Sequence, residues 1–112
     1  MPTVYVVQEN PRMNYLPAEK FGEVKFLTAS EFSASQHSLR NKQILEQVME
    51  NLSNFDPDKD YLVLSGNPII MGFVFSLLIQ KKGYLRVLWY HSIDREYVEV
   101  NFNPSQILSM SS

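Results

Sequence analysis

The sequence has no cysteine among its 112 residues. This absence excludes disulfide bonds, thiolate nucleophiles, and zinc or iron–sulfur sites built from cysteine. Histidine is almost as scarce, because His37 and His91 are the only two and lie far apart in the chain. We therefore assign no metal site and no cofactor, and we expect His37 to be an exposed residue rather than a ligand.

The chain also lacks an excess of charge of either sign. Ten Lys and Arg residues against 12 Asp and Glu residues give a formal net charge of -2. Proteins that bind duplex DNA usually present a basic face that neutralises phosphates, and an acidic mimic of nucleic acid would be far more negative. The composition therefore argues against a nucleic-acid partner.

Membrane and export signals are missing as well. The N-terminal segment has no basic residues and contains the acidic Glu9, so it does not have the pattern of a signal peptide. Residues 61–79 carry no charge, but Ser65-Gly66-Asn67-Pro68 interrupts this run with residues typical of a strand end and a helix start. We predict a cytoplasmic protein that does not enter a membrane.

The pattern of apolar residues predicts a single α/β domain over residues 1–102, followed by a loose polar tail over 103–112. The element order is β-β-α-β-α-β-β. The expected strands are residues 3–8, 23–28, 60–65, 84–90 and 96–102, and the expected helices run from a cap at Ser33 to before Asp56 and from 69 to 82. The two most apolar strands should be central and parallel in a mixed sheet, and the last two should form an antiparallel hairpin at one edge.

The junction between the strand at 60–65 and the following helix is the first candidate ligand site. Unpaired amides at a helix N-terminus favour an anion, and open α/β sheets bind ligands at the carboxyl ends of their strands. The strand at 3–8 ends at the same edge. The candidate ligand-binding residues are therefore Ser65, Gly66, Asn67, Gln8, Glu9 and Asn10. The alternative interpretation is a tight turn with a helix cap, because the glycine pattern of neither the P-loop nor the dinucleotide fold is present.

The turn of the predicted hairpin is the second candidate. His91 and Asp94 are spaced to form an acid–base pair, and Arg95 offers a cation for an anion. The alternative is an ordinary solvated turn. Ser65 also lacks the glycine pattern of a nucleophile elbow. We therefore assign no catalytic residue to the chain.

The helix predicted over 69–82 is apolar around nearly its whole circumference. A helix of this kind is either deeply buried or covered by a partner. Because one small domain offers few elements to cover it, we predict a protein interface at Phe73, Phe75 and Leu78, with a second copy of the chain as the simplest partner. A third hypothesis is binding of single-stranded nucleic acid by stacking on Tyr84, Trp89, Tyr90 and Tyr97.

Two segments resemble short uncharacterised proteins encoded by tailed bacteriophages. They are residues 60–68, with a strand followed by a Gly-x-Pro helix start, and residues 85–98, with Trp89, Asp94-Arg95 and Tyr97-Val98. The present sequence departs from that pattern by placing residues 90–93 between the tryptophan and Asp94. The resemblance implies a phage origin and carries over no functional residue. The leading hypothesis is a non-enzymatic binding protein in the host cytoplasm that acts through protein contacts, as a homodimer or on a host or phage partner.

Overall fold

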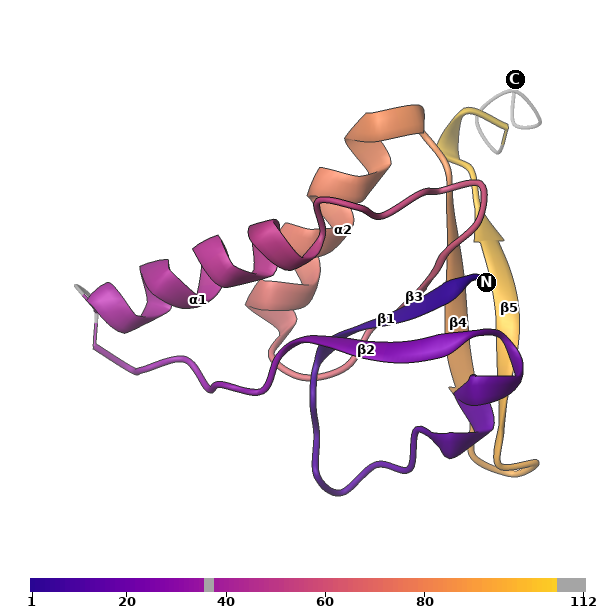
Figure 1. Cartoon of the computed structure of the whole chain (residues 1–112), viewed down its shortest axis with the longest axis horizontal. Coiled ribbons are helices and arrows are strands. Elements are labelled where there is room, and N and C mark those ends of the chain that lie inside the picture. Colours follow the sequence, from indigo (N-terminus) through magenta and orange to yellow (C-terminus); the bar gives the residue numbers. More distant parts are fainter. Residues whose placement is uncertain (36–37, 107–112) are drawn as a thin grey trace.

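The computed structural model describes residues 1–35 and 38–106, which form a five-stranded sheet with helices (Figure 1). The strand order is β2-β1-β3-β4-β5. The first four strands are parallel to one another, and β5 runs antiparallel to β4. This arrangement confirms the predicted mixed α/β sheet with a C-terminal hairpin. The elements are β1 (Thr3–Gln8), a 3-10 helix η1 (Leu16–Lys20), β2 (Glu23–Thr28), α1 (Leu39–Asn51), β3 (Tyr61–Val63), α2 (Pro68–Lys82), β4 (Leu85–His91) and β5 (Glu96–Phe102).

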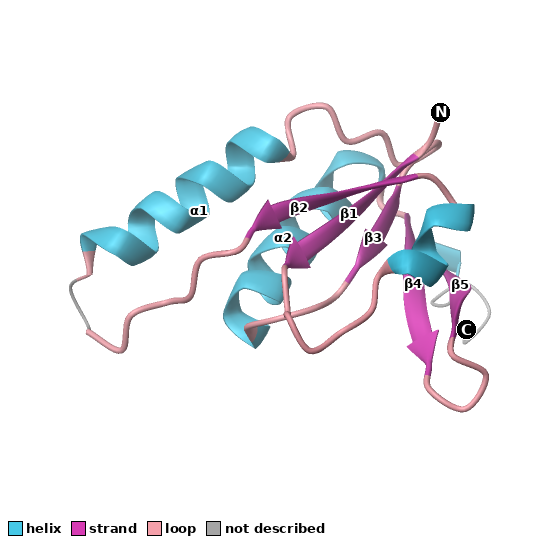
Figure 2. Ribbon diagram, turned by 60° about the horizontal axis from the view of Figure 1, so that its bottom comes forward, coloured by secondary structure: helices cyan, strands magenta, loops and turns pink. Residues whose placement is uncertain are grey.

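Strand β1 lies inside the sheet and is covered on both faces, as its apolar sequence predicts. Tyr5 and Val7 pack beneath the helices, whereas Val4 and Val6 point to the opposite face. This division follows from the alternation of side chains along a strand. The helices α1 and α2 cover the first face, and the segment between β1 and β2, including η1, covers part of the second (Figure 2).

Helix α1 begins later than the sequence predicts. Its N-cap is Ser38, whose hydroxyl accepts a hydrogen bond from the backbone amide of Asn41 at 3.3 Å. Ser33, the predicted cap, is instead held by the side chain of Asn41, which accepts from the Ser33 amide and donates to its carbonyl. Gln36, the expected partner of Ser33 in a capping box, lies outside the described residues, as does His37.

Helix α2 begins and ends close to its predicted limits. Pro68 occupies its first turn, and Gly83 ends it in the left-handed conformation with φ 77°. The uncharged run 61–79 is divided between β3 and this helix. Within residues 1–35 and 38–106, no helix combines the length and apolar character needed to cross a bilayer.

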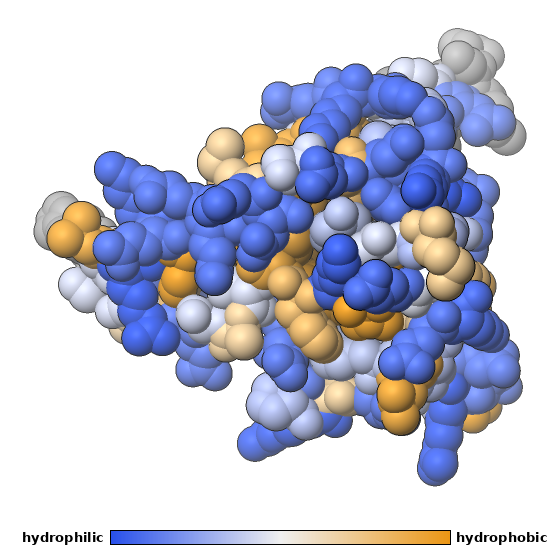
Figure 3. Space-filling view, in the orientation of Figure 1, coloured by the Kyte–Doolittle hydropathy of each residue, from blue (hydrophilic) through white to orange (hydrophobic). Residues whose placement is uncertain are grey.

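Much of the molecular surface is polar. In the view of Figure 3, hydrophilic side chains cover most of α1, and hydrophobic ones show through in the hollow between α1 and β2. Of the predicted tail, the structure describes only the beginning, where the Asn103 side chain accepts a hydrogen bond from the amide of Gln106. Residues 107–112 lie outside the described chain.

Candidate functional site

The structure brings the predicted junction residues together at the carboxyl edge of β1 and β3. A cleft of about 400 Å³ opens there, between the segment that leaves β1 and the turn that enters α2. It is lined by Gln8, Glu9, Asn10, Pro11, Glu31, Phe32, Gly66 and Asn67. The segments that follow the two strands therefore line one cleft.

Gln8 fills the space that a ligand would need at the junction. Its side-chain oxygen accepts a hydrogen bond from the Asn67 amide at 2.6 Å, and its side-chain nitrogen donates to the Ser30 carbonyl at 2.8 Å. Gly66 makes this approach possible, because a Cβ at that position would lie 2.3 Å from the Gln8 side-chain oxygen. The junction is thus closed by the protein's own amide group.

The hydrogen-bond donors that would hold an anion are occupied. The Asn67 amide is bonded to Gln8, and the Ile69 amide donates to the Asn67 side chain at 2.8 Å, which is a helix N-cap. In addition, Glu9 and Glu31 line the cleft and repel anions. The geometry therefore supports the alternative of a tight turn with a helix cap.

Ser65 takes part in a second structural network. Its hydroxyl lies 2.8 Å from the Tyr15 hydroxyl, which also accepts a hydrogen bond from the Asn10 amide at 2.9 Å. Ser65 is buried and donates to the sulfur of Met13 at 3.8 Å. These contacts tie the loop after β1 to the end of β3 and give the serine no base.

The predicted pair in the hairpin turn is present. The Nδ1 atom of His91 lies 3.0 Å from a carboxylate oxygen of Asp94. The Asp94 side chain is 68% exposed, so water competes for the contact. Arg95 supplies the left-handed backbone of the turn, with φ 54°, and its role here is conformational. The arrangement is that of a solvated turn.

The three residues of the predicted interface on α2 differ in their burial. Leu78 is 0% exposed and lies in the core together with Ile70 and Val74, so it is not available to a partner. Phe73 and Phe75 are partly buried against the same core, and the Phe75 ring packs edge-on against Phe102 at 4.9 Å. The sheet and α1 shelter more of this helix than its composition suggests.

A group of exposed apolar side chains lies on the hairpin. Trp89 is 55% exposed, and Val98 and Val100 are each 44% exposed. The register pairs Trp89 with Val98 and Val87 with Val100, so these four side chains point to the helix-bearing side of the sheet. We call Val87, Trp89, Val98 and Val100 the hairpin apolar face. The alternating residues Val98, Val100 and Phe102 were the sequence signal for it.

The aromatic residues proposed to stack on nucleic acid are divided between environments. Tyr97 is only 2% exposed and lies in the core beneath η1. Tyr90 neighbours Trp89 along β4 and therefore points to the other side of the sheet. Tyr84 donates a hydrogen bond to Asp58. No shared stacking platform results from these four residues.

Several side chains have shifted pKa values, among them Asp58 and Tyr97. Hydrogen bonds from Lys82 and Tyr84 lower the pKa of Asp58. Burial raises the pKa of Tyr97 to about 12, with smaller contributions from Tyr15 and Tyr90. The Tyr97 hydroxyl has no hydrogen-bond partner among the described residues. Within the same part of the chain, no cluster of three or more His, Asp or Glu residues is arranged for a metal ion.

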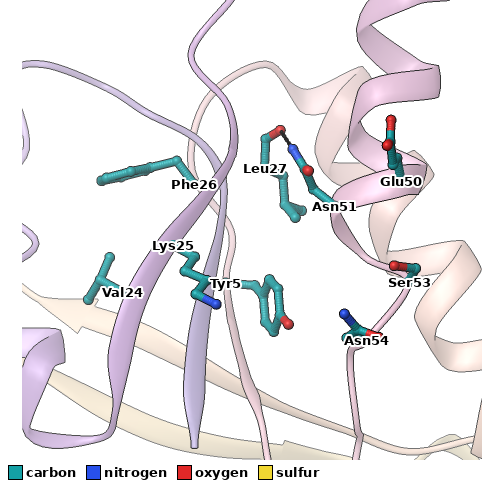
Figure 4. Close-up of a pocket in the computed structure, with 9 residues that line it drawn as sticks. All are labelled: Tyr5, Val24, Lys25, Phe26, Leu27, Glu50, Asn51, Ser53 and Asn54. Atoms are coloured by element: carbon teal, nitrogen blue, oxygen red, sulfur yellow. Dashed lines mark hydrogen bonds between the residues drawn. The ribbon is translucent and has the colours of Figure 1, made fainter.

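A larger cleft, of about 490 Å³, lies between β2 and the end of α1 (Figure 4). Lys25 and Glu50 line it with opposite charges, and the Tyr5 ring lies at its base. The Asn51 side chain reaches across to donate a hydrogen bond to the Leu27 carbonyl at 2.9 Å. This contact fastens α1 to the edge of β2.

A comparison with known protein families identifies the family of the chain. The model of the Phage Pam3 gp32-like protein family matches residues 2–104. The chain belongs to this family. The match spans both segments on which the phage resemblance rested, so that prediction is confirmed. No curated protein and no solved structure matches the sequence.

Proposed function

We propose that this member of the Pam3 gp32-like family is a non-enzymatic binding protein that acts through protein contacts in the host cytoplasm. Its contact surface is the hairpin apolar face, and its partner is a second copy of the chain. The observation that carries the proposal is the exposure of Trp89 between two valines of the same face. Tryptophan is enriched at the centres of protein interfaces, where it buries a large area.

The surroundings of this face suit a symmetric partner. None of its four residues is charged, so two copies can approach without desolvating or opposing like charges. On the same side of the hairpin, the charged residue that follows Val98 toward the turn is Glu96, at the start of β5, and interface rims are commonly polar. A contact of this kind covers the apolar residues that the two helices leave open.

The test compares variants in sedimentation velocity at micromolar concentration. The native chain should sediment as a dimer, and Trp89→Glu should sediment as a monomer with an unchanged circular dichroism spectrum, because its side chain is outside the core. The matched control is Ile69→Glu, which places the same charge at a 67% exposed residue of α2. It should leave the dimer intact.

Two results contradict the proposal. One is a native chain that sediments as a monomer. The other is a dimer that Ile69→Glu dissociates while Trp89→Glu does not, which would return the interface to α2.

A further inference from the structure

The two edges of the sheet differ in how they are protected. At β2, the Asn51 side chain bonds the Leu27 carbonyl, and Lys25 lies in the strand. At the other edge, β5 is seven residues long and contains neither lysine nor proline. No strand of the described chain lies beyond it. Lysine and proline within a strand are common protection of an edge against pairing with another strand, and β5 has neither. The ion pair between Lys20 and Glu96 lies at the first residue of the strand.

The side chains of β5 restrict how a second β5 can pair with it. Val98, Val100 and Phe102 point to the helix-bearing side, and Tyr97, Glu99 and Asn101 point to the other side. In an antiparallel pair, opposite residues point to the same face. The apolar residues of the two copies therefore stay together only in registers that place the helix-side residues of one β5 opposite the helix-side residues of the other.

Among the registers whose two-fold axis lies at Val98, Glu99 or Val100, one satisfies both apolar and charge complementarity. If Val100 faces Val100 of the second copy, Val98 faces Phe102 and Glu99 faces Asn101. If the axis lies at Glu99 instead, the two Glu99 carboxylates oppose each other, which is destabilising. If it lies at Val98, Glu96 faces Val100 of the second copy and places a charge among apolar side chains.

We propose that two copies pair antiparallel along β5, with the two-fold axis at the Val100 pair. This inference rests on the proposed function. It places the two hairpin apolar faces side by side in one sheet, with Val98 and Val100 next to the second copy and Trp89 one strand away from it. The sheets of both copies become one. A row of apolar side chains then runs across four strands from Trp89 through Val98 to Phe102 and Leu85 of the second copy, because the register already pairs Trp89 with Val98 and Leu85 with Phe102.

The absence of native cysteine allows a direct test, since each introduced cysteine is the only thiol in the chain. Cα atoms of directly opposite residues in an antiparallel pair lie about 4.5–5.5 Å apart, within the range that a disulfide spans. Val100→Cys should therefore form a disulfide-linked dimer under mild oxidation. Val98→Cys and Glu99→Cys test the two competing registers, and Ser92→Cys in the exposed turn measures random collision.

We expect Val100→Cys to cross-link at least about tenfold faster than the other three variants, because thiol–disulfide exchange depends on access and geometry. Faster cross-linking of Glu99→Cys or Val98→Cys overturns the register. A dimer by sedimentation in which none of the β5 variants exceeds Ser92→Cys overturns pairing along the edge and leaves the proposed contact surface standing. A monomeric native chain overturns both proposals.

Discussion

At the scale of single residues, buried polar side chains join parts of the backbone that are distant in sequence. The Asp60 carboxylate accepts one hydrogen bond from the Thr3 amide and one from the Asp56 amide, each at 2.9 Å. Gln8 does the same for the other end of β1, where it bonds Asn67 and Ser30. Each end of the central strand is thereby fixed by a side chain that satisfies buried backbone groups.

Tyr97 is an exception, because its buried hydroxyl lacks a partner among the described residues, as does the Nε atom of Arg86. Tyr97→Phe should therefore leave the free energy of unfolding near neutral pH unchanged or raise it by up to about 1 kcal/mol. Tyr15→Phe is the matched control. It should lower the free energy of unfolding by about 1–2 kcal/mol, because Tyr15 bonds both Ser65 and Asn10. Urea unfolding of both variants measures the difference.

The same residue predicts an alkaline pH dependence. Above the ordinary tyrosine pKa of 10.0, the unfolded chain loses the Tyr97 proton while the folded chain keeps it up to about 12. The folded state then binds more protons, so the free energy of unfolding falls as the pH rises through this window. In Tyr97→Phe the fall should be shallower, with the remainder due to Tyr5 and Tyr84, whose pKa values are also raised. Equal slopes for both proteins would contradict this assignment.

At the scale of elements, the turn between β3 and α2 depends on Gly66. Its φ of 101° is unfavourable for other residues, and a Cβ would overlap the Gln8 side chain. Gly66→Ala should therefore lower the free energy of unfolding by about 2–4 kcal/mol. Gly72→Ala, within α2, meets no atom within 4 Å and should raise it by about 0.5–1 kcal/mol. Chemical denaturation of the two variants checks the opposite signs, and equal effects would contradict the geometry.

The ends of the helices and strands could be predicted where they depend on neighbouring residues in the sequence. β1, β2 and the start of α2 agree with prediction because alternation, the asparagine cap and Pro68 are local signals. The start of α1 does not, because the Asn41 side chain holds Ser33 outside the helix. That contact depends on how the chain folds back on itself, and the spacing of apolar residues in the sequence does not reveal it.

The candidate sites divide in the same way. The meeting of Gln8 with Asn67 was predictable in outline, since parallel strands end at one edge of a sheet. The hydrogen bond from the Asn67 amide to the Gln8 side chain was not predictable, because it depends on the exact distance between the two residues in the folded chain. The hairpin apolar face also escaped prediction, because it depends on how far α2 extends across the sheet. The alternation in β5 shows one apolar side, but not whether a helix covers it.

At the scale of the whole molecule, the helical layer is narrower than the sheet. The helices cover β1, β2 and one end of the hairpin, where α2 packs against Leu85 and Phe102, and they leave Trp89, Val98 and Val100 exposed on the same face (Figures 1 and 2). The proposed association through these residues would stabilise the folded state by mass action. The thermal midpoint of the native chain should therefore rise with protein concentration, whereas that of Trp89→Glu should not. Scanning calorimetry over an about 100-fold range of concentration measures this, and a constant native midpoint would contradict association.

The position of the unprotected edge in the chain has a consequence for synthesis. β5 follows the other four strands in sequence, so it leaves the ribosome after them. Nascent chains on neighbouring ribosomes of one messenger cannot join along this strand while their sheets are still incomplete. Under the proposed pairing, this edge is therefore presented only by molecules whose other strands are already made, and the order of translation keeps half-finished chains from pairing along it.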